Sequence, residues 1–114
     1  MVLEDEALLY ELLHDLLHFE GYVVCKPDQL KDVVSEMRAD PPVAAIIDVN
    51  LKEVNGLDLL DQIRADEKLK SMAVLISSGL DYKQESLKRG ADGFLQKPYM
   101  PDELVNLLKK TVKS

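Results

Sequence analysis

The sequence is poor in cysteine, in basic residues and in long apolar runs. Cys25 is the single cysteine among 114 residues, so the chain cannot form an internal disulfide, which suits a reducing compartment. No apolar run approaches the roughly 20 residues that span a bilayer, and no basic segment followed by an apolar one opens the chain. We therefore expect a cytoplasmic protein without a membrane partner.

Basic side chains are outnumbered by acidic ones. The chain has 14 Lys and Arg residues against 21 Asp and Glu residues, which gives a net charge of −7. Such a surface repels phosphate backbones and anionic lipid, so we expect no direct binding to nucleic acid. With 46% hydrophobic and 31% charged residues, the composition is that of a globular protein. The length and the lack of repeats or linkers predict one domain over residues 1–114, with no output domain in this chain.

Short apolar segments alternate with amphipathic ones along the chain. Residues 43–47 form a continuous apolar run, typical of a strand that is covered on both faces. We predict strands near residues 1–3, 22–25, 43–47, 73–76 and 94–97, and helices near residues 6–19, 27–37, 57–63, 82–89 and 101–113. This alternation favours an α/β fold with a parallel sheet and helices on both faces.

Three of these segments carry more specific expectations. The first helix is expected to bury one stripe of leucines, namely Leu9, Leu12, Leu13, Leu16 and Leu17. Cys25 is expected to be a small buried residue of the second strand. The last helix ends in basic residues that suit the helix dipole, namely Lys109, Lys110 and Lys113.

Polar residues follow four of the predicted strands where each strand ends. They are Glu4 and Asp5 after the first strand, Asp48 after the third, Ser77 and Ser78 at the end of the fourth, and Lys97 after the fifth. Ligands of open parallel sheets bind outside the carboxyl ends of the strands, so these side chains are expected to converge at one edge. Any one of them alone would be explained as a helix or turn cap. The ordered set favours a site.

Three converging carboxylates need a compensating cation. Two unit charges about 4 Å apart repel by roughly 4 kcal/mol at an effective dielectric of 20. Ligands that are all oxygen favour a hard ion, magnesium above all. An aspartate at a strand end with a magnesium ion, a lysine and a hydroxyl is an arrangement for phosphoryl transfer.

Four segments in order resemble the receiver domain of bacterial two-component response regulators. They are Glu4-Asp5-Glu6, Ile46-Ile47-Asp48 with Asn50 and Gly56 following, Leu75-Ile76-Ser77-Ser78-Gly79, and the stretch from Gly90 to Tyr99, which contains Lys97-Pro98. The resemblance covers essentially the whole chain. It implies a flavodoxin-like (βα)5 three-layer sandwich, a five-stranded parallel sheet in the order 2-1-3-4-5.

The resemblance also implies a role for each site residue. Asp48 would accept a phosphoryl group from the phosphohistidine of a histidine kinase or a phosphotransfer protein. Magnesium, or manganese in its place, would be held by Glu4, Asp5, Asp48 and the backbone carbonyl of Asn50. Lys97 would bind the phosphoryl group, and Ser78, with Ser77 as the alternative, would close onto it. Phe94 would change rotamer and report the event.

The implied output is a conformational switch rather than the turnover of a conventional enzyme. A new dianion on Asp48 would alter the face made by the fourth helix, the last strand and the last helix, where a partner, an output domain or a second copy of the chain would bind. The acyl phosphate would then hydrolyse slowly. Lys52 stands where the family usually has proline, so we expect a positive charge near the site.

Three other functions are weighed against an active receiver. A pseudo-receiver would use the same fold as a protein-binding module without phosphorylation. A phosphatase with Asp48 as nucleophile would usually carry a second carboxylate two residues later, where this chain has Asn50. The segment His14-Asp15-Leu16-Leu17-His18 has the histidine spacing of a helical zinc motif, but it lacks a third ligand and is expected to be a solvated helix face.

Overall fold

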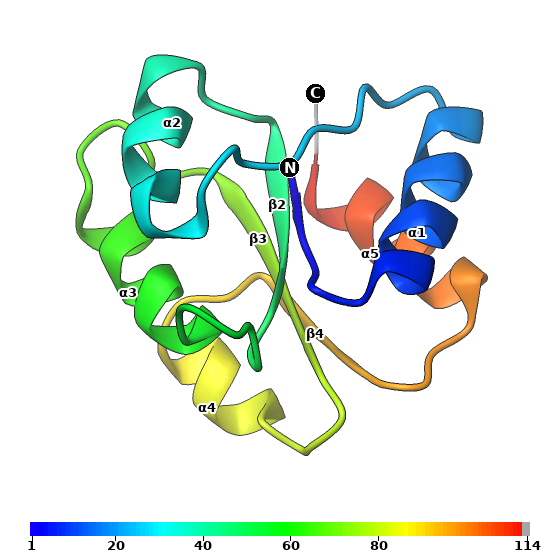
Figure 1. Cartoon of the computed structure of the whole chain (residues 1–114). Coiled ribbons are helices and arrows are strands. Elements are labelled where there is room, and N and C mark those ends of the chain that lie inside the picture. Colours follow the sequence, from blue (N-terminus) through cyan, green and yellow to red (C-terminus); the bar gives the residue numbers. More distant parts are fainter. Residues whose placement is uncertain (113–114) are drawn as a thin grey trace.

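A parallel four-stranded sheet lies between two layers of helices in the computed structural model, which describes residues 1–112 (Figure 1). The strands are β1 (Val2–Leu3), β2 (Ala44–Asp48), β3 (Ala73–Ser78) and β4 (Gly93–Gln96). The helices are α1 (Ala7–Phe19), the 3-10 turn η1 (Leu30–Asp32), α2 (Val33–Ala39), α3 (Gly56–Ala65), α4 (Lys83–Lys88) and α5 (Pro101–Thr111). The predicted α/β class is confirmed.

The strands lie in the order β1-β2-β3-β4, and every neighbouring pair is parallel. These four are the first, third, fourth and fifth strands predicted from the sequence, and their relative order is the predicted one. Their registers align Leu3 with Ile47, Asp48 with Ser77, and Ser78 with Gln96. The carboxyl ends of all four strands therefore meet at one edge of the sheet.

Residues 22–25, the expected second strand, are not assigned as a strand. They run beside β1, but only one backbone hydrogen bond joins the two segments in the described residues, from the amide of Val2 to the carbonyl of Cys25 (2.9 Å). Val24 packs on the core, whereas Val23 is 95% exposed and Cys25 is exposed. The expectation of a buried cysteine was wrong, because alternate side chains of this edge segment face solvent.

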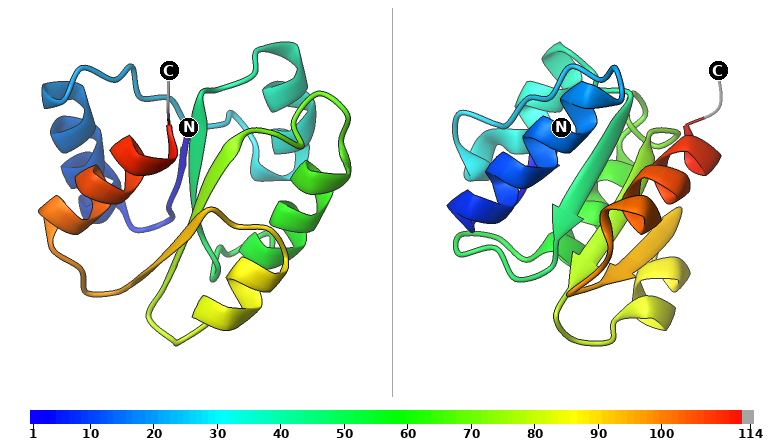
Figure 2. Two further views of the ribbon diagram at one scale, coloured as in Figure 1. Left: turned by 180° about the vertical axis from the view of Figure 1, so that it is seen from behind. Right: turned by 90° about the vertical axis from the view of Figure 1, so that its right-hand side faces the viewer.

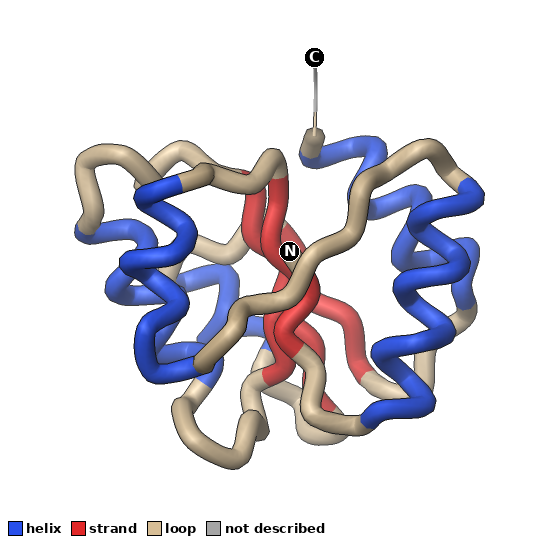
Figure 3. Tube along the Cα trace, turned by 45° about the horizontal axis from the view of Figure 1, so that its top comes forward, coloured by secondary structure: helices blue, strands red, loops and turns tan. Residues whose placement is uncertain are grey.

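Helices cover both faces of the sheet (Figures 2 and 3), and each face has its own apolar core. On one face Leu3, Ile47 and Ile76 pack against α2 and α3. On the other face Val2, Ile46, Leu75 and Leu95 pack against α1 and α5. Neighbouring residues of one strand point to opposite faces, so continuous apolar strands are what two helical layers require.

Helix α1 covers the sheet with fewer of its leucines than expected. Leu13 and Leu17 are buried, but Leu12 is 57% exposed and Leu8 is 81% exposed. The leucines of α1 extend around more of the helix than the sheet can cover, so the expectation that Leu12 is buried was wrong. Of the basic residues at the end of the last helix, Lys113 lies outside the described residues. No helix within residues 1–112 is long and apolar enough to cross a membrane.

Candidate functional site

An ion-pair cluster occupies the carboxyl edge of the sheet. The Lys97 Nζ atom lies 2.7 Å from Glu4 Oε1 and 3.3 Å from Asp48 Oδ2. The side chains of Glu4 and Asp48 are 5% and 9% exposed, and that of Lys97 is 22% exposed. Three residues at the carboxyl ends of three different strands are thus brought together in a partly desolvated cluster, in which two carboxylates share one cation.

Asp48 is fixed by the loop that follows β2. The Val49 amide bonds to the Ser77 carbonyl (2.9 Å), and the Gly56 amide returns to the Val49 carbonyl (2.9 Å). A Cβ atom on Gly56 would lie 2.4 Å from the carbonyl oxygen of Asp48. Only glycine permits this approach, so α3 begins directly against the backbone that carries Asp48.

The side chain of Asn55 begins helix α3 and closes the same loop. Its Oδ1 atom accepts hydrogen bonds from the amides of Leu57 (2.8 Å) and Asp58 (3.3 Å), as expected for an N-cap. An isolated antiparallel bridge pairs Asn50 with Asn55. The turn at Asn55-Gly56 therefore holds the loop between Asp48 and α3 in a defined shape.

Ser78 is connected to Asp48 through Asn50. The Asn50 amide donates to Asp48 Oδ1 (3.4 Å), while its side-chain Nδ2 donates to Ser78 Oγ (3.4 Å). Ser78 Oγ also accepts from the Leu80 amide (3.1 Å). Ser77 is the register partner of Asp48, and both serines are buried. The hydroxyl that is linked to the Asp48 loop by a hydrogen bond is that of Ser78.

The third acidic residue, Asp5, is held apart from the ion-pair cluster. Its Oδ2 atom accepts a hydrogen bond from the backbone amide of Lys52 (2.5 Å), and the residue is exposed. Glu4 Oε2 accepts from the Glu6 amide (3.1 Å). Within residues 1–112 no three His, Cys, Asp or Glu side chains gather as a metal-binding group. In donor type the set still fits a hard cation, because every candidate ligand is an oxygen.

The charge of Lys97 is stabilised by its surroundings. Burial alone would lower the pKa of its ammonium group. The hydrogen bonds to Glu4 and Asp48 and the negative charges of these carboxylates have a larger opposite effect, so the pKa is raised. Lys97 therefore remains a fixed cation beside Asp48.

Tyr99 lies close to the same carboxylates. Burial, and then the negative charges of Glu4 and Asp48, raise the pKa of Tyr99 to about 12. Its hydroxyl oxygen is buried and has no hydrogen-bond partner among the described residues. The phenol is consequently held neutral beside the site.

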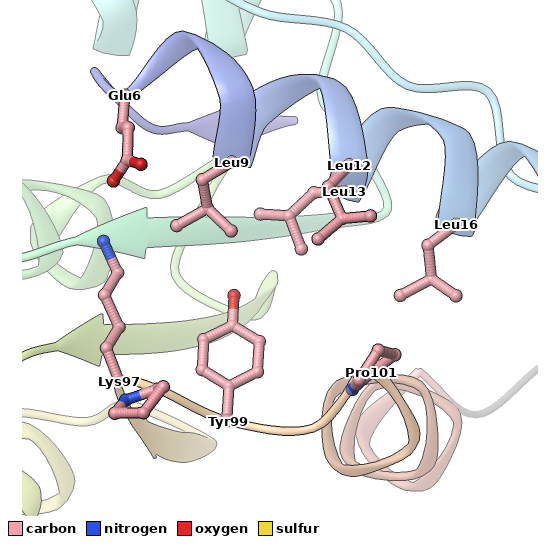
Figure 4. A pocket seen from close by; sticks show the side chains of 9 residues that line it. Glu6, Leu9, Leu12, Leu13, Leu16, Lys97, Tyr99 and Pro101 are labelled. Carbon is pink, nitrogen blue, oxygen red and sulfur yellow. The ribbon is translucent and has the colours of Figure 1, made fainter.

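An apolar groove of about 410 Å³ separates α1 from the segment between β4 and α5. Its wall on α1 is made of Leu9, Leu12, Leu13 and Leu16. Lys97 and Tyr99 reach toward this helix from the opposite side (Figure 4). The groove thus extends from the leucines of α1 to Lys97 of the ion-pair cluster.

Phe94, the expected switch residue, lies in β4 opposite Ile76 of β3. It is half-buried and packs against the core on the side of α2 and α3. Partial exposure leaves this ring some freedom to move, which a fully packed side chain would lack.

Sequence reasoning identified the residues of the edge but not their detailed pairing. It located Glu4, Asp48 and Lys97, which the structure joins, and Asp5, which the structure holds apart from them. It did not single out the Tyr99 hydroxyl or the backbone contact of Gly56. The proximity of Gly56 to Asp48 in the sequence and the Asn55-Gly56 turn were the available signals for that contact. No local sequence pattern indicates that the Tyr99 hydroxyl has no partner among residues 1–112, because that depends on which segments pack around it in the fold.

The chain is similar in sequence and in fold to response regulators of two-component signalling. The response regulator receiver domain family matches residues 1–109. The two-component response regulator PhoP of Pseudomonas aeruginosa is 37% identical over 108 residues, which cover 91% of this chain and 47% of PhoP. The DNA-binding response regulator MtrA of Mycolicibacterium paratuberculosis is 31% identical, covering 92% of this chain and 47% of MtrA. The chain thus spans about half the length of these relatives.

Solved structures share the fold over nearly the whole chain. A response regulator from Chloroflexus aurantiacus superposes with a TM-score of 0.90 at 25% identity, covering 97% of this chain and 93% of that one. The receiver domain of NtrX from Brucella abortus gives a TM-score of 0.86 at 22% identity, covering 97% and 95%. The chain belongs to the response regulator receiver domain family. Domains of this family interact with histidine kinases and output domains, and they typically bind Mg²⁺.

Proposed function

We propose that Asp48 is the phosphoacceptor of this receiver domain and takes its phosphoryl group from a phosphohistidine of a partner kinase or phosphotransfer protein. The observation that supports this most is the position of Lys97 Nζ, 3.3 Å from Asp48 Oδ2. An aspartate that becomes phosphorylated needs a fixed cation within reach of the phosphoryl oxygens, because they gain negative charge on transfer. Lys97 supplies that cation on a segment held by the sheet.

The transfer itself is a displacement at phosphorus. A carboxylate oxygen of Asp48 forms the new P–O bond while the P–N bond of the phosphohistidine breaks, and the imidazole leaves with the bonding electron pair and takes up a proton. In the later hydrolysis, water attacks phosphorus and the P–O bond to Asp48 breaks. Asp48 returns as a carboxylate, and inorganic phosphate is released.

The proposed magnesium ligands are Glu4, Asp5, Asp48 and the backbone carbonyl of Asn50. A bound divalent ion would supply positive charge to the oxygens of the transferring phosphoryl group. Lys97 shares the carboxylates of Glu4 and Asp48, so it balances their charge and keeps both carboxylates at the edge of the sheet. Asp5 lies next to Glu4 in the chain, and its carboxylate accepts a hydrogen bond from the Lys52 amide.

Ser78 is the proposed switch hydroxyl. As an acceptor from Asn50 Nδ2 and the Leu80 amide, its oxygen still has its own proton to donate. A phosphoryl group on Asp48 offers strong acceptor oxygens, and the pull on Ser78 would move the segment that leads to α4. Phe94 would follow by changing its rotamer. Ser77 remains the alternative, because it is the register partner of Asp48.

The output surface is proposed to be the face made by α4, β4 and α5. A homodimer or an output domain would bind there, and Leu87 of α4 is 43% exposed. The acidic balance of the chain supports the absence of direct nucleic-acid binding by this domain. A cytoplasmic location and a single receiver over residues 1–114 remain predictions from the sequence.

Intact mass spectrometry after incubation with a small phosphodonor and Mg²⁺ tests the proposal. We expect the protein without substitutions to gain the mass of one phosphoryl group and to lose it at alkaline pH, as an acyl phosphate does. The variant Asp48→Asn should stay unmodified, and omission of Mg²⁺ should slow the reaction strongly. Asp58→Asn is a matched control, because Asp58 lies in α3 and contacts Arg89 rather than Lys97.

Three results would count against this function. If the protein without substitutions is correctly folded but gains no phosphate, a pseudo-receiver is favoured. That function would agree with the absence of a three-carboxylate group within residues 1–112. Steady turnover of small phosphate esters would favour a phosphatase instead. Phosphate that persists in Asp48→Asn would place the acceptor elsewhere.

A further inference from the structure

Two histidines form a stacked pair on the outer surface of α1. His14 and His18 lie one helical turn apart, with ring centroids 6.1 Å apart and ring planes inclined by only 12°. His18 is exposed, and the side chain of His14 is 45% exposed. Both rings therefore face solvent from the same side of a helix whose other side is packed on the sheet.

The spacing of the rings suits a shared metal ion. Metal–nitrogen bonds of about 2.0–2.1 Å put a zinc ion roughly 3 Å from the centre of each imidazole, so centroids about 5–6 Å apart can bind the same ion. The rings of His14 and His18 are already close to that separation and need only rotate about their side-chain bonds. Because both are accessible to solvent, such rotation meets no packed core.

The carboxylate of Asp15 contacts one of the two imidazoles, that of His14. Its Oδ1 atom lies 3.4 Å from His14 Nδ1, where an ionised carboxylate favours a proton on that nitrogen. The other nitrogen, Nε2, is then left unprotonated with a free lone pair. Ligating histidines in metal sites commonly donate their second ring nitrogen to a carboxylate in this way.

We infer that His14 and His18 form a binding site for a divalent transition-metal ion such as Zn²⁺ or Ni²⁺. Imidazole nitrogen is a preferred ligand of these ions, whereas the oxygen ligands near Asp48 suit Mg²⁺. The net charge of −7 further favours a cation at the surface. The inference is independent of the proposed phosphoacceptor, because none of its ligands belongs to the ion-pair cluster.

Two imidazoles leave positions of the ion open. Asp15 is the only carboxylate in direct contact with the pair among the described residues, and no third His, Cys, Asp or Glu side chain completes a metal-binding group there. Tetrahedral zinc would therefore keep positions for water or for a ligand from another molecule. Such an open site differs from the closed four-ligand sites that hold small domains together.

Calorimetric titration of the full chain with ZnCl₂ and NiCl₂, in a non-chelating buffer that contains excess Mg²⁺, tests the inference. We expect one ion per chain, with binding lost in His14→Ala and in His18→Ala. Asp15→Ala should weaken binding about tenfold, because it removes the group that orients His14. The ring-proton resonances of both histidines should shift together in NMR spectra as the ion is added.

Three control variants separate this site from other ligands in the chain. Asp48→Asn, Cys25→Ser and Glu11→Gln should bind zinc as the unmodified sequence does. Binding that survives the double variant His14→Ala/His18→Ala, or that disappears in Cys25→Ser or Asp48→Asn, would overturn the inference, as would the absence of saturable binding. Unchanged thermal unfolding of the His14 and His18 variants without metal would show that loss of binding is not loss of fold.

Discussion

Lys97 and Glu4 are 93 positions apart in the chain, and their side chains form an ion pair of 2.7 Å. The pair joins the segment after β1 to the segment after β4. Asp48 is a second partner of Lys97, so the ion pairs join three distant segments of the chain at one edge of the sheet. Neither carboxylate is well hydrated, so each depends on the lysine for compensation of its charge.

Replacement of Lys97 should destabilise the fold in a way that a divalent cation can correct. In Lys97→Met the free energy of unfolding should fall by about 2–3 kcal/mol, because two nearly buried carboxylates lose their cation. Chemical denaturation measures this, and Mg²⁺ should restore more stability to the variant than to the unmodified sequence. Lys109→Met is the control, since its ion pair with Glu20 is exposed to solvent and should contribute little to stability. Equal losses in the two variants would contradict the role of Lys97.

Removal of the Tyr99 hydroxyl should stabilise the protein. The buried oxygen has no partner in the described residues, so Tyr99→Phe should raise the free energy of unfolding by about 1 kcal/mol at pH 8. Denaturant titrations of both proteins measure the difference. A loss of stability in the variant would mean that the hydroxyl has a hydrogen-bond partner.

The same substitution should change the response to alkali. The pKa of Tyr99 is raised to about 12 in the folded protein, whereas an unfolded tyrosine loses its proton near pH 10. Between these values the unfolded chain binds fewer protons, so stability falls as pH rises through this window and is unaffected by Tyr99 below it. Tyr99→Phe should lack this part of the decline, and the phenolate absorbance of the unmodified protein should contain a step near pH 12 that the variant lacks.

The sequence was sufficient to predict the edge of the sheet at which the candidate site lies. Asp48 ends the continuous apolar run of a strand that is covered on both faces, and the carboxyl ends of such parallel strands are where ligands bind. The same rule located Ser78 and Lys97. These predictions succeeded because two helical layers impose a simple pattern on the strands between them.

Predictions that depend on the tertiary environment were less successful. Residues 22–25 carry the composition of a strand, but one backbone hydrogen bond to β1 is not enough to extend the sheet. Leu12 fits the helical spacing of its neighbours, yet α1 meets the sheet through Leu13 and Leu17. The separate positions of Asp5 and Glu4 depend on a loop amide from Lys52, which no local pattern reveals.

Arg64, in the last turn of α3, is a structural residue with several hydrogen-bond partners. Its guanidinium donates to the carbonyls of Gly90 (2.8 Å), Lys70 (3.1 Å) and Met72 (2.7 Å), and it pairs with Asp92. Arg64→Met should leave the partly buried carbonyls of Gly90 and Met72 unsatisfied and lower the free energy of unfolding by about 2–3 kcal/mol.

Thermal and denaturant unfolding of Arg64→Met should be compared with Arg38→Met. Arg38 forms a single ion pair with Asp66, and its side chain is 51% exposed, so its loss should cost less than about 1 kcal/mol. If the Arg64 variant is as stable as the Arg38 variant, the three carbonyls must form hydrogen bonds with water when the guanidinium is removed.

Gly56→Ala should disturb the backbone of Asp48 itself. The added methyl group would lie 2.4 Å from the Asp48 carbonyl oxygen and 2.9 Å from Val49 Cα, and neither backbone atom can move without shifting β2 or α3. We expect the free energy of unfolding to fall by about 2 kcal/mol, even though alanine is the better helix former. Gly79→Ala is a matched control, because a Cβ atom at Gly79 would have no neighbour within 4 Å. The free energy of unfolding of this variant should change by no more than about 0.5 kcal/mol. If Asp48 is the acceptor, Gly56→Ala should also slow phosphorylation by the small phosphodonor. Normal stability and a normal phosphorylation rate in this variant would show that the loop after β2 can change shape without moving the carboxylate.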